Sequence, residues 1–392
     1  MSTTNSTINS IMDSINIEFK KEHIIHELLK NQNDFDLVTN IKKNMIDVKK
    51  QDVNIQFQTR SEKTIQRITV PIPKNGMAFN NVKLVIELNE KSNVKINPKD
   101  LINWVEITIG GDCLEKIHGH SMNILYEMYD LFVSRNKNAI VIPLPFDITN
   151  QNNVILMKLL EYHDTRINME FTNEFSISKA YFNITYYDFD ELKKVEDIKK
   201  YNVYFNHDQS YTHYINLYKC VATYEHDVIF ANNYYSNCIN LFPNHPSNEM
   251  IFYFLDENKN LITDQLFDSY TLLLDGTEAI NENYVILVNK TLAKFNKSLP
   301  SNINGIYYVN LENIYNGVYT DFSKIKNPNL IFKNNQTDST NNTNNANNTN
   351  NQTDTNNQTD NTNKKKYTMC VLFMECNVGR YAGGMFRSHY QN

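Results

Sequence analysis

Apolar and polar side chains alternate along four segments in the first half of the chain. The segments 82–88, 104–109, 167–171 and 182–186 carry apolar residues at every second position. Alternation with a period of two is typical of a strand in a sheet that buries one face. Strands of this kind, separated by turn residues, predict a β-sandwich.

The same style of sequence continues in the second half of the chain. The dipeptide Asp275-Gly276 follows one apolar segment and is a good signal for a tight turn between strands. We therefore expect a second β-rich unit, and its strand candidates are 215–221, 250–255, 270–274, 284–288, 306–311, 330–332 and 367–373.

Helical spacing interrupts the strand pattern. Apolar residues at intervals of three and four over 122–132 predict a helix. A short amphipathic helix is also predicted over 17–30, within residues 1–50, which we interpret as an N-terminal arm. Residues 190–200 are charged and contain no aromatic side chain, and we interpret them as the connection between two domains.

Residues 334–363 have a low-complexity composition. Of these residues, 14 are Asn and 8 are Thr, and none is aromatic or a large aliphatic residue. Such a segment buries too little apolar surface to offset the entropy lost on ordering, so we expect a disordered loop. Strand-like sequence resumes after 364–366, which predicts a surface loop between two strands.

Composition argues against several classes of protein. The net charge of −6 and the charged fraction of 21% give no basic surface for nucleic acid. The five cysteines form no Cys-x-x-Cys pair and their number is odd, so we expect a reducing compartment. Residues 1–10 are polar, which argues against a signal peptide, and no apolar run reaches the ~18 residues of a membrane span.

Two motifs in the first half combine turn residues with strand sequence. The motif over 104–119 contains Gly110-Gly111, where the chain can reverse direction because no Cβ obstructs it. The motif over 142–171 begins with a turn whose prolines hold φ and prevent a helix from starting early. The distinctive residues of the second motif are Pro143, Pro145, Tyr162 and His163.

Three further motifs follow over 242–254, 305–332 and 371–390. The first of them is a turn by its own chemistry, and the other two combine strands with turns. Their distinctive residues are, in order, Asn244, His245 and Pro246; Gly305, Tyr307, Phe322 and Ser323; and Asn377, Arg380, Gly384 and Met385.

In their order and spacing, the five motifs resemble the major capsid proteins of nucleocytoplasmic large DNA viruses. The resemblance implies a mainly β chain of two tandem antiparallel eight-stranded jelly-roll β-sandwiches, a double jelly roll, with short helices in loops. It divides the chain into the arm 1–50, a first jelly roll 51–190, a charged linker 191–200 and a second jelly roll 201–392.

Two details of the family pattern concern the first jelly roll. The resemblance implies an apolar helix after the turn at Pro145. The family also has an N-terminal apolar strand followed by a basic, aromatic segment, and residues 1–60 contain no clear equivalent. The nearest candidate, 53–68, lacks the aromatic character.

The resemblance implies a structural role. Three subunits would form a homotrimer whose six jelly rolls give a pseudo-hexagonal capsomer, and capsomers would tile an icosahedral shell. The implied partners are neighbouring capsomers, minor capsid proteins and an internal virion membrane, in a virion assembled in the host cytoplasm. No catalytic residue, cofactor or nucleic-acid partner is expected.

Three other functions are compatible with the sequence. A scaffold protein similar to the rifampicin target of poxviruses would share the double jelly roll and organise a virion membrane transiently. A minor capsid paralogue would carry the same motifs. A carbohydrate-binding β-sandwich would use exposed aromatic side chains to bind a glycan.

One pair of histidines is typical of the start of a metal site of the cupin kind. His118 and His120 lie two residues apart, and two histidines with a carboxylate can bind a metal. However, Glu127 lies too far along, on the predicted helix, and no second histidine motif follows. We therefore expect no metal site, and no P-loop or Ser-His-Asp signature is found. The remaining candidates, which lack ligand spacing, are His207, His213 and His226.

Overall fold

The computed structural model describes most of the chain between residues 48 and 388. Several expectations lie outside the described residues: the N-terminal arm up to residue 47 with its helix over 17–30, the linker 191–200, the loop 334–363, any role of His207 and the side chain of His213. The described residues are 48–59, 64–76, 78–89, 96–129, 131, 133–136, 139–149, 155–189, 204–205, 211–230, 237–295, 304–312, 314, 319–333 and 365–388.

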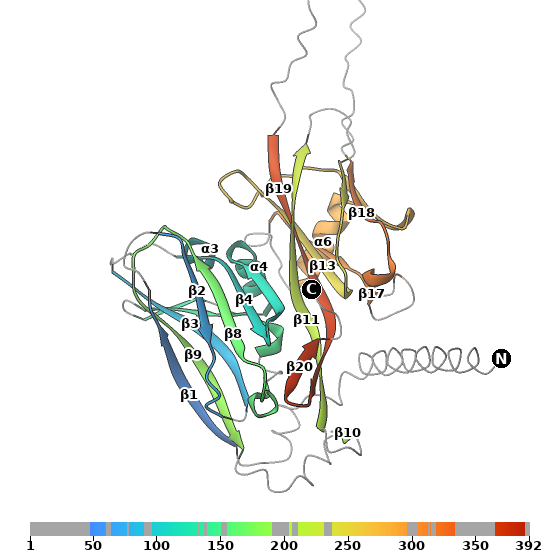
Figure 1. Cartoon of the computed structure of the whole chain (residues 1–392). Helices are drawn as coiled ribbons and strands as arrows, with labels where there is room; N and C mark the ends of the chain where they lie inside the picture. The colour runs from blue at the N-terminus through green and yellow to red at the C-terminus, as the bar shows by residue number, and fades with distance from the viewer. Residues whose placement is uncertain are drawn as a thin grey trace, which may run out of the picture.

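Two antiparallel sheets face each other in the first half of the chain (Figure 1, blue to green). Their strand orders are β1-β9-β3-β7-β6 and β2-β8-β4-β5. The strands of the first sheet are β1 (Val48–Phe57), β9 (Ile177–Phe189), β3 (Ala78–Leu88), β7 (Ala139–Pro143) and β6 (Ser134–Asn136). Those of the second are β2 (Gln66–Pro71), β8 (Thr165–Phe171), β4 (Ile102–Ile109) and β5 (Asp112–His118).

Two further antiparallel sheets form the second half, with the orders β10-β11-β19-β13-β16 and β12-β18-β14-β15. The larger sheet contains β10 (Tyr204–Phe205), β11 (Tyr211–Phe230), β19 (Lys365–Ala382), β13 (Pro246–Leu255) and β16 (Ile306–Asn310), and the short strands β17 (Thr320–Asp321) and β20 (Met385–Ser388) pair with β13 and β19. The smaller sheet contains β12 (Asn237–Asn240), β18 (Pro328–Lys333), β14 (Ser269–Leu274) and β15 (Thr277–Asn283).

Both halves have the same strand topology. Among the described residues, and without the short strands β6, β10, β17 and β20, each half has eight strands, which we number from 1 to 8 in chain order. In each half, one sheet then has the order 1-8-3-6 and the other the order 2-7-4-5. This is the arrangement of a jelly roll, in which two sheets pair to form one sandwich. The expected double jelly roll is therefore confirmed.

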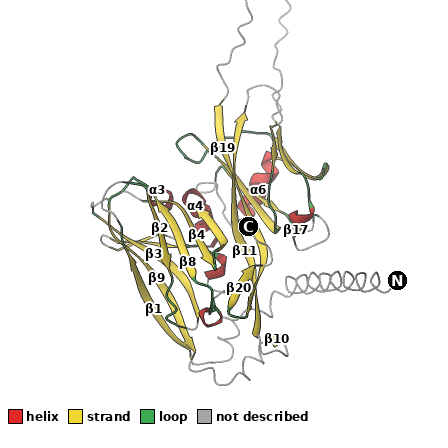
Figure 2. Cartoon of the chain, viewed as in Figure 1, coloured by secondary structure: helices red, strands yellow, loops and turns green. Residues whose placement is uncertain are grey.

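Helices occupy equivalent connections in the two jelly rolls, as Figure 2 shows in red. Helix α4 (Gly119–Tyr129) directly follows β5, and helix α6 (Tyr284–Lys294) directly follows β15. The third α-helix of the described residues, α3 (Pro98–Leu101), precedes β4. No helix in this described part is long and apolar enough to cross a membrane.

The prediction of a strand over 284–288 is wrong, because this segment forms the first half of α6. The Asn283 side chain accepts a hydrogen bond of 2.9 Å from the backbone N–H of Ile286 and so caps the helix. Leu287 and Thr291, one turn apart, are buried, whereas Ile286 is exposed. The β-branched residues favour a strand locally, but the cap and the buried stripe favour the helix.

Two expectations for the first jelly roll need correction. Between Pro145 and β8, the described residues contain no α-helix but two short 3-10 helices, η1 (Asp147–Thr149) and η2 (Met157–Leu159). The N-terminal strand that the sequence pattern missed is β1, which pairs with β9 along its whole length. The residues of β1 that face away from the core are polar. Near the end of the strand, only every second residue packs on the core, so the apolar alternation in the sequence is weak.

The central strands of the larger second-half sheet are buried on both faces. One face of β13 and β19 packs inside the second jelly roll, and the other packs with apolar residues of the first. Such strands have near-continuous apolar sequence instead of alternation. The residues that point inside are Met250, Phe252, Phe254, Met369, Val371 and Phe373, and those that face the first jelly roll are Ile251, Tyr253, Leu255, Cys370, Leu372 and Met374.

We expect Phe252→Ala to destabilise the protein strongly. The Phe252 ring is wholly buried and lies within 6.1 Å of five other aromatic rings, centroid to centroid. Truncating a buried Phe costs about 3–5 kcal/mol because it leaves a cavity. The matched control is Phe242→Ala, since Phe242 is 62% exposed and should cost about 0.5 kcal/mol. Urea unfolding followed by circular dichroism measures both, and equal losses would contradict the described core.

Candidate functional site at the interface between the jelly rolls

The two jelly rolls pack against each other through one face of the second-half sheet. In Figure 1, helix α4 lies between the first jelly roll and strands β11 and β13. Ser121 of α4 bonds the Tyr253 hydroxyl of β13, with 3.0 Å between the oxygens. Met122, Leu125 and Tyr126 of α4 belong to the same apolar core as the outward-facing residues of β13 and β19. This continuous core makes the two sandwiches one block.

A second contact joins the loop before β8 to the turn between β19 and β20. We call it the interdomain seam, formed by residues 156–164 and 381–386. The Tyr162 N–H donates to the Gly384 carbonyl at 2.9 Å, and the Phe386 N–H donates to His163 Nδ1 at 3.2 Å. At the other end, the Tyr381 hydroxyl accepts a bond of 3.3 Å from the Leu156 N–H. Two motifs more than 200 residues apart therefore meet at this seam.

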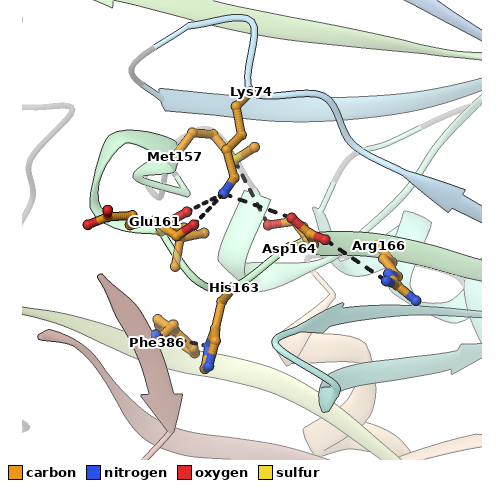
Figure 3. A network of polar contacts seen from close by, with 9 residues as sticks. Lys74, Met157, Glu161, His163, Asp164, Arg166 and Phe386 are labelled. Atoms are coloured by element: carbon orange, nitrogen blue, oxygen red, sulfur yellow. Dashed lines mark hydrogen bonds and ion pairs between the residues drawn. The ribbon is translucent and has the colours of Figure 1, made fainter. Parts of the chain in front are cut away.

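Lys74 holds the same loop from the side of the first jelly roll (Figure 3). Its ammonium group donates to the backbone carbonyls of Leu160 and Glu161. It also lies 3.8 Å from a carboxylate oxygen of Asp164, whose other oxygen lies 3.9 Å from Arg166. In Figure 3, His163 points away from this group towards Phe386. The loop is thus fixed on both sides, which orients the seam residues.

Two glycines of the motifs make the close approach at the seam sterically possible. Gly110 has φ +63° and faces the ring of His163 so closely that an added Cβ would overlap it. Gly384 has φ +76°, and a Cβ there would lie 2.8 Å from Glu161 Cβ and from the Tyr162 ring. Their neighbours Gly111 and Gly383 also have positive φ, but a Cβ at either would meet nothing. Sequence reasoning found the turns but not the packing that requires Gly110 and Gly384.

A buried carboxyl group lies where β5, η1 and β11 meet. The Glu115 side chain is fully buried and accepts bonds from the N–H groups of Asp147 and Ile148, at 3.0 and 2.9 Å. Burial, reinforced by the Asp147 carboxylate, raises the pKa of Glu115 to about 8, while the N–H donors of Ile148, Asp147 and Val221 act in the opposite direction. Sequence reasoning missed this group, because Glu115 reads as an ordinary polar position on a strand.

Several motif residues gather at one end of the second jelly roll. His245 is buried and bonds Glu375 of β19, which is buried too. Pro246 begins β13 and pairs with Asp321 of β17. Asp321 caps the short helix η3 (Phe322–Lys324) by accepting a bond of 3.2 Å from the backbone N–H of Ser323, and it also accepts one of 2.6 Å from the Ser323 hydroxyl. The Phe322 ring is buried against Phe373, 5.2 Å away between centroids. These residues stabilise a corner of the sandwich.

The remaining motif residues are spread over the fold and form no common site. Pro143 ends β7 and its carbonyl accepts a 2.6 Å bond from the Tyr126 hydroxyl, while Pro145 is buried. Gly305, directly before β16, has φ +82° and packs against the carbonyl of Ile262. Tyr307 of β16 is buried in the core of the second jelly roll. Asn377 is a buried residue of β19, whereas the exposed ones are Asn244, Arg380 and Met385.

The structure adds a third residue to His118 and His120. This residue is Glu225 of β11, and not Glu127, which lies in α4. A carboxylate oxygen of Glu225 lies 3.1 Å from His118 Nδ1 and 3.1 Å from His120 Nε2. Sequence reasoning could not find Glu225, since it lies 105 residues from His120 and meets it only through the contact between β5 and β11.

The fold and the interface define the class of protein: a double jelly roll, with two sandwiches of equal topology packed into one block. No protein-family model and no curated protein sequence matches the chain.

Solved structures show the same fold in viral capsid proteins. The chain is similar to a protein of a quasi-atomic model of the PBCV-1 virus capsid, with a TM-score of 0.61 and 14% identity over 88% of this chain and 98% of that one. PBCV-1 VP54, fitted into a reconstruction of the virophage Sputnik, gives a TM-score of 0.58 with the same identity and coverage. The Faustovirus major capsid protein gives 0.54 with 6% identity, over 84% of this chain and 90% of that one.

We expect Gly384→Ala to destabilise the protein more than Gly383→Ala. Both substitutions place a Cβ on a residue with positive φ, which costs about 1–2 kcal/mol. Only Gly384 also faces the seam, where overpacking adds about 1–3 kcal/mol. Urea unfolding compares the two variants, and equal losses of unfolding free energy would show that the seam does not depend on this close approach.

We expect the buried Glu115 to make stability fall as pH rises. Its pKa is about 8 in the folded chain and lies near 4.5 ordinarily, so between these values the folded state holds a proton that the unfolded chain has released. The loss is at most about 1.4 kcal/mol per pH unit. Unfolding measured from pH 5 to pH 8 should give a shallower slope for Glu115→Gln than for the wild type. The exposed control Glu161→Gln should keep the wild-type slope; an unchanged slope in Glu115→Gln would contradict the raised pKa.

Proposed function

We propose that the chain is a capsid protein, a structural building block of a virus shell rather than an enzyme. The observation that carries this proposal is the repeated jelly-roll topology within one chain. The similar solved structures described above are viral capsid proteins, which supports the same role for this chain. The five sequence motifs support the same role. Most of their distinctive residues lie at turns, at corners of a sandwich or in the interdomain seam, and these features determine how the two sandwiches form one block.

The block suits a trimeric capsomer. Each chain contributes two sandwiches of equal topology, so threefold association places six similar units around one axis. Such a trimer has a near-hexagonal outline, which can tile a surface in contact with neighbouring trimers. The continuous core across the interface supports this proposal, because a tile must keep its two sandwiches in a constant relative position.

The proposed partners follow from the tile. A capsomer in a shell contacts other capsomers and minor capsid proteins, and an internal membrane can lie beneath it. In the chain, the Asn- and Thr-rich segment 334–363 lies between β18 of one sheet and β19 of the other. A polar segment with three Asp and no Lys or Arg would present a hydrated surface, and we propose no binding role for it.

We expect the purified chain to form a homotrimer. Native mass spectrometry should give three times the chain mass of 45.9 kDa, and the trimer should persist on dilution because obligate interfaces are large and apolar. As a control, deletion of residues 340–357 should leave the trimer intact, since Ala346 is the only apolar residue in this segment. A stable monomer at micromolar concentration would contradict the capsomer.

A second measurement separates a shell protein from a scaffold. Cryo-electron microscopy of mature particles should show the trimer in the density of the shell. A trimer that is present during assembly but absent from mature particles would instead support the scaffold function.

A further inference from the structure

We propose that His118, His120 and Glu225 form a binding site for one divalent transition-metal ion, of the zinc class, which joins the two jelly rolls. The proposal is independent of the capsid function. Within the described part of the chain, these residues are the one group of His, Cys, Asp and Glu side chains placed closely enough to hold a metal.

The spacing of the three side chains fits a tetrahedral ion. Glu225 Oε1 lies 3.1 Å from His118 Nδ1 and from His120 Nε2, and the three ligand atoms lie within 4.8 Å of one another. A tetrahedral zinc ion about 2.0–2.2 Å from each ligand separates neighbouring ligand atoms by about 3.3 Å. Small side-chain movements therefore suffice to admit the ion. Two imidazoles and one carboxylate are also a ligand set that zinc uses with one position left for water.

The chain holds the two histidines in a defined geometry. His118 ends β5 and His120 lies in the first turn of α4, with 5.3 Å between the ring centroids. Gly119 between them packs against the Ile102 carbonyl of β4, where a Cβ would overlap that oxygen. The strand end, the glycine and the helix start thus fix both imidazoles on rigid elements, which favours metal binding by pre-organisation.

A second layer of contacts can hold His120 in the form that binds a metal. Its Nδ1 lies 2.6 Å from the Tyr253 hydroxyl, which in turn lies 3.0 Å from the Ser121 hydroxyl. In the form that binds an ion, Nδ1–H donates to the Tyr253 hydroxyl, the phenol donates to Ser121, and the Nε2 lone pair faces the ion; without an ion, Nε2–H can donate to Glu225 while Nδ1 accepts from Tyr253. Metal-binding histidines commonly have such a partner on their other ring nitrogen.

The site is accessible from one side. The His120 side chain is 9% exposed, whereas those of His118 and Glu225 are 27% and 43% exposed. An ion can therefore enter past Glu225, and water can occupy the fourth position. Because two ligands belong to the first jelly roll and one to β11 of the second, a bound ion would tie the two sandwiches together at a place distinct from the seam.

Zinc binding by the full-length protein tests the proposal. The protein is treated with EDTA, transferred to metal-free buffer and titrated with Zn²⁺ by calorimetry, with retained zinc measured after gel filtration. We expect one ion per chain and a rise in melting temperature on saturation. Cobalt(II), added as a probe, should give the visible absorption of a tetrahedral site.

The variants identify the ligands. Glu225→Gln and His118→Ala should each weaken zinc binding by more than about tenfold, since even loss of a supporting group costs that much, and should abolish the rise in melting temperature. The matched control is His226→Ala, because His226 neighbours Glu225 in the chain but stacks on Phe242 instead. Glu225 is exposed, so Glu225→Gln should fold even if His118→Ala does not.

Two outcomes would overturn the proposal. One is a wild-type protein that retains no zinc, in which case the three side chains form only a hydrogen-bonded bridge. The other is zinc that binds equally well to Glu225→Gln, which would place the ion elsewhere. Zinc is counted per chain, so neither result depends on whether the protein is a trimer.

Discussion

The arrangement of this protein depends on a sheet that is apolar on both faces. Inside the second jelly roll, β13 and β19 bury one set of side chains in their own sandwich. Their other faces carry apolar residues such as Ile251 and Leu372, which would contact water if the first jelly roll were absent. Because exposed apolar area is unfavourable in proportion to its size, the two sandwiches must remain packed together.

Polar groups then determine how the two jelly rolls are oriented. Apolar packing is not directional, but the hydrogen bonds of the seam and of Glu115 have defined geometry. At the seam, the Tyr162 backbone bonds the Gly384 backbone, and the His163 ring accepts a bond from a backbone N–H. At another place, the Glu115 side chain joins β5 to η1 and β11. Burying a carboxyl is unfavourable, so its contacts must be well formed to be retained. A rigid block of two sandwiches is the consequence.

The similarity to capsid proteins at 14% identity or less has a physical explanation. A jelly roll requires apolar residues at alternate positions and turns at suitable places, and many sequences meet those requirements. Few positions require one particular residue type. Gly110 is such a position, because its left-handed backbone and its contact with His163 leave no space for a side chain. A few turn and corner residues can therefore carry a resemblance that the rest of the sequence has lost.

The sequence alone determined the β-sandwich class, most strands and the turns at Gly110 and Gly276, because alternation and turn chemistry act between residues close in the chain. Its local signals failed at α6, where a cap and a buried stripe override β-branched residues, and at β1, whose outer face is polar. The tertiary structure alone decided which motifs meet at the seam and that Glu225 joins His118 and His120. These contacts span more than 100 residues, and no periodic pattern encodes which distant strands become neighbours.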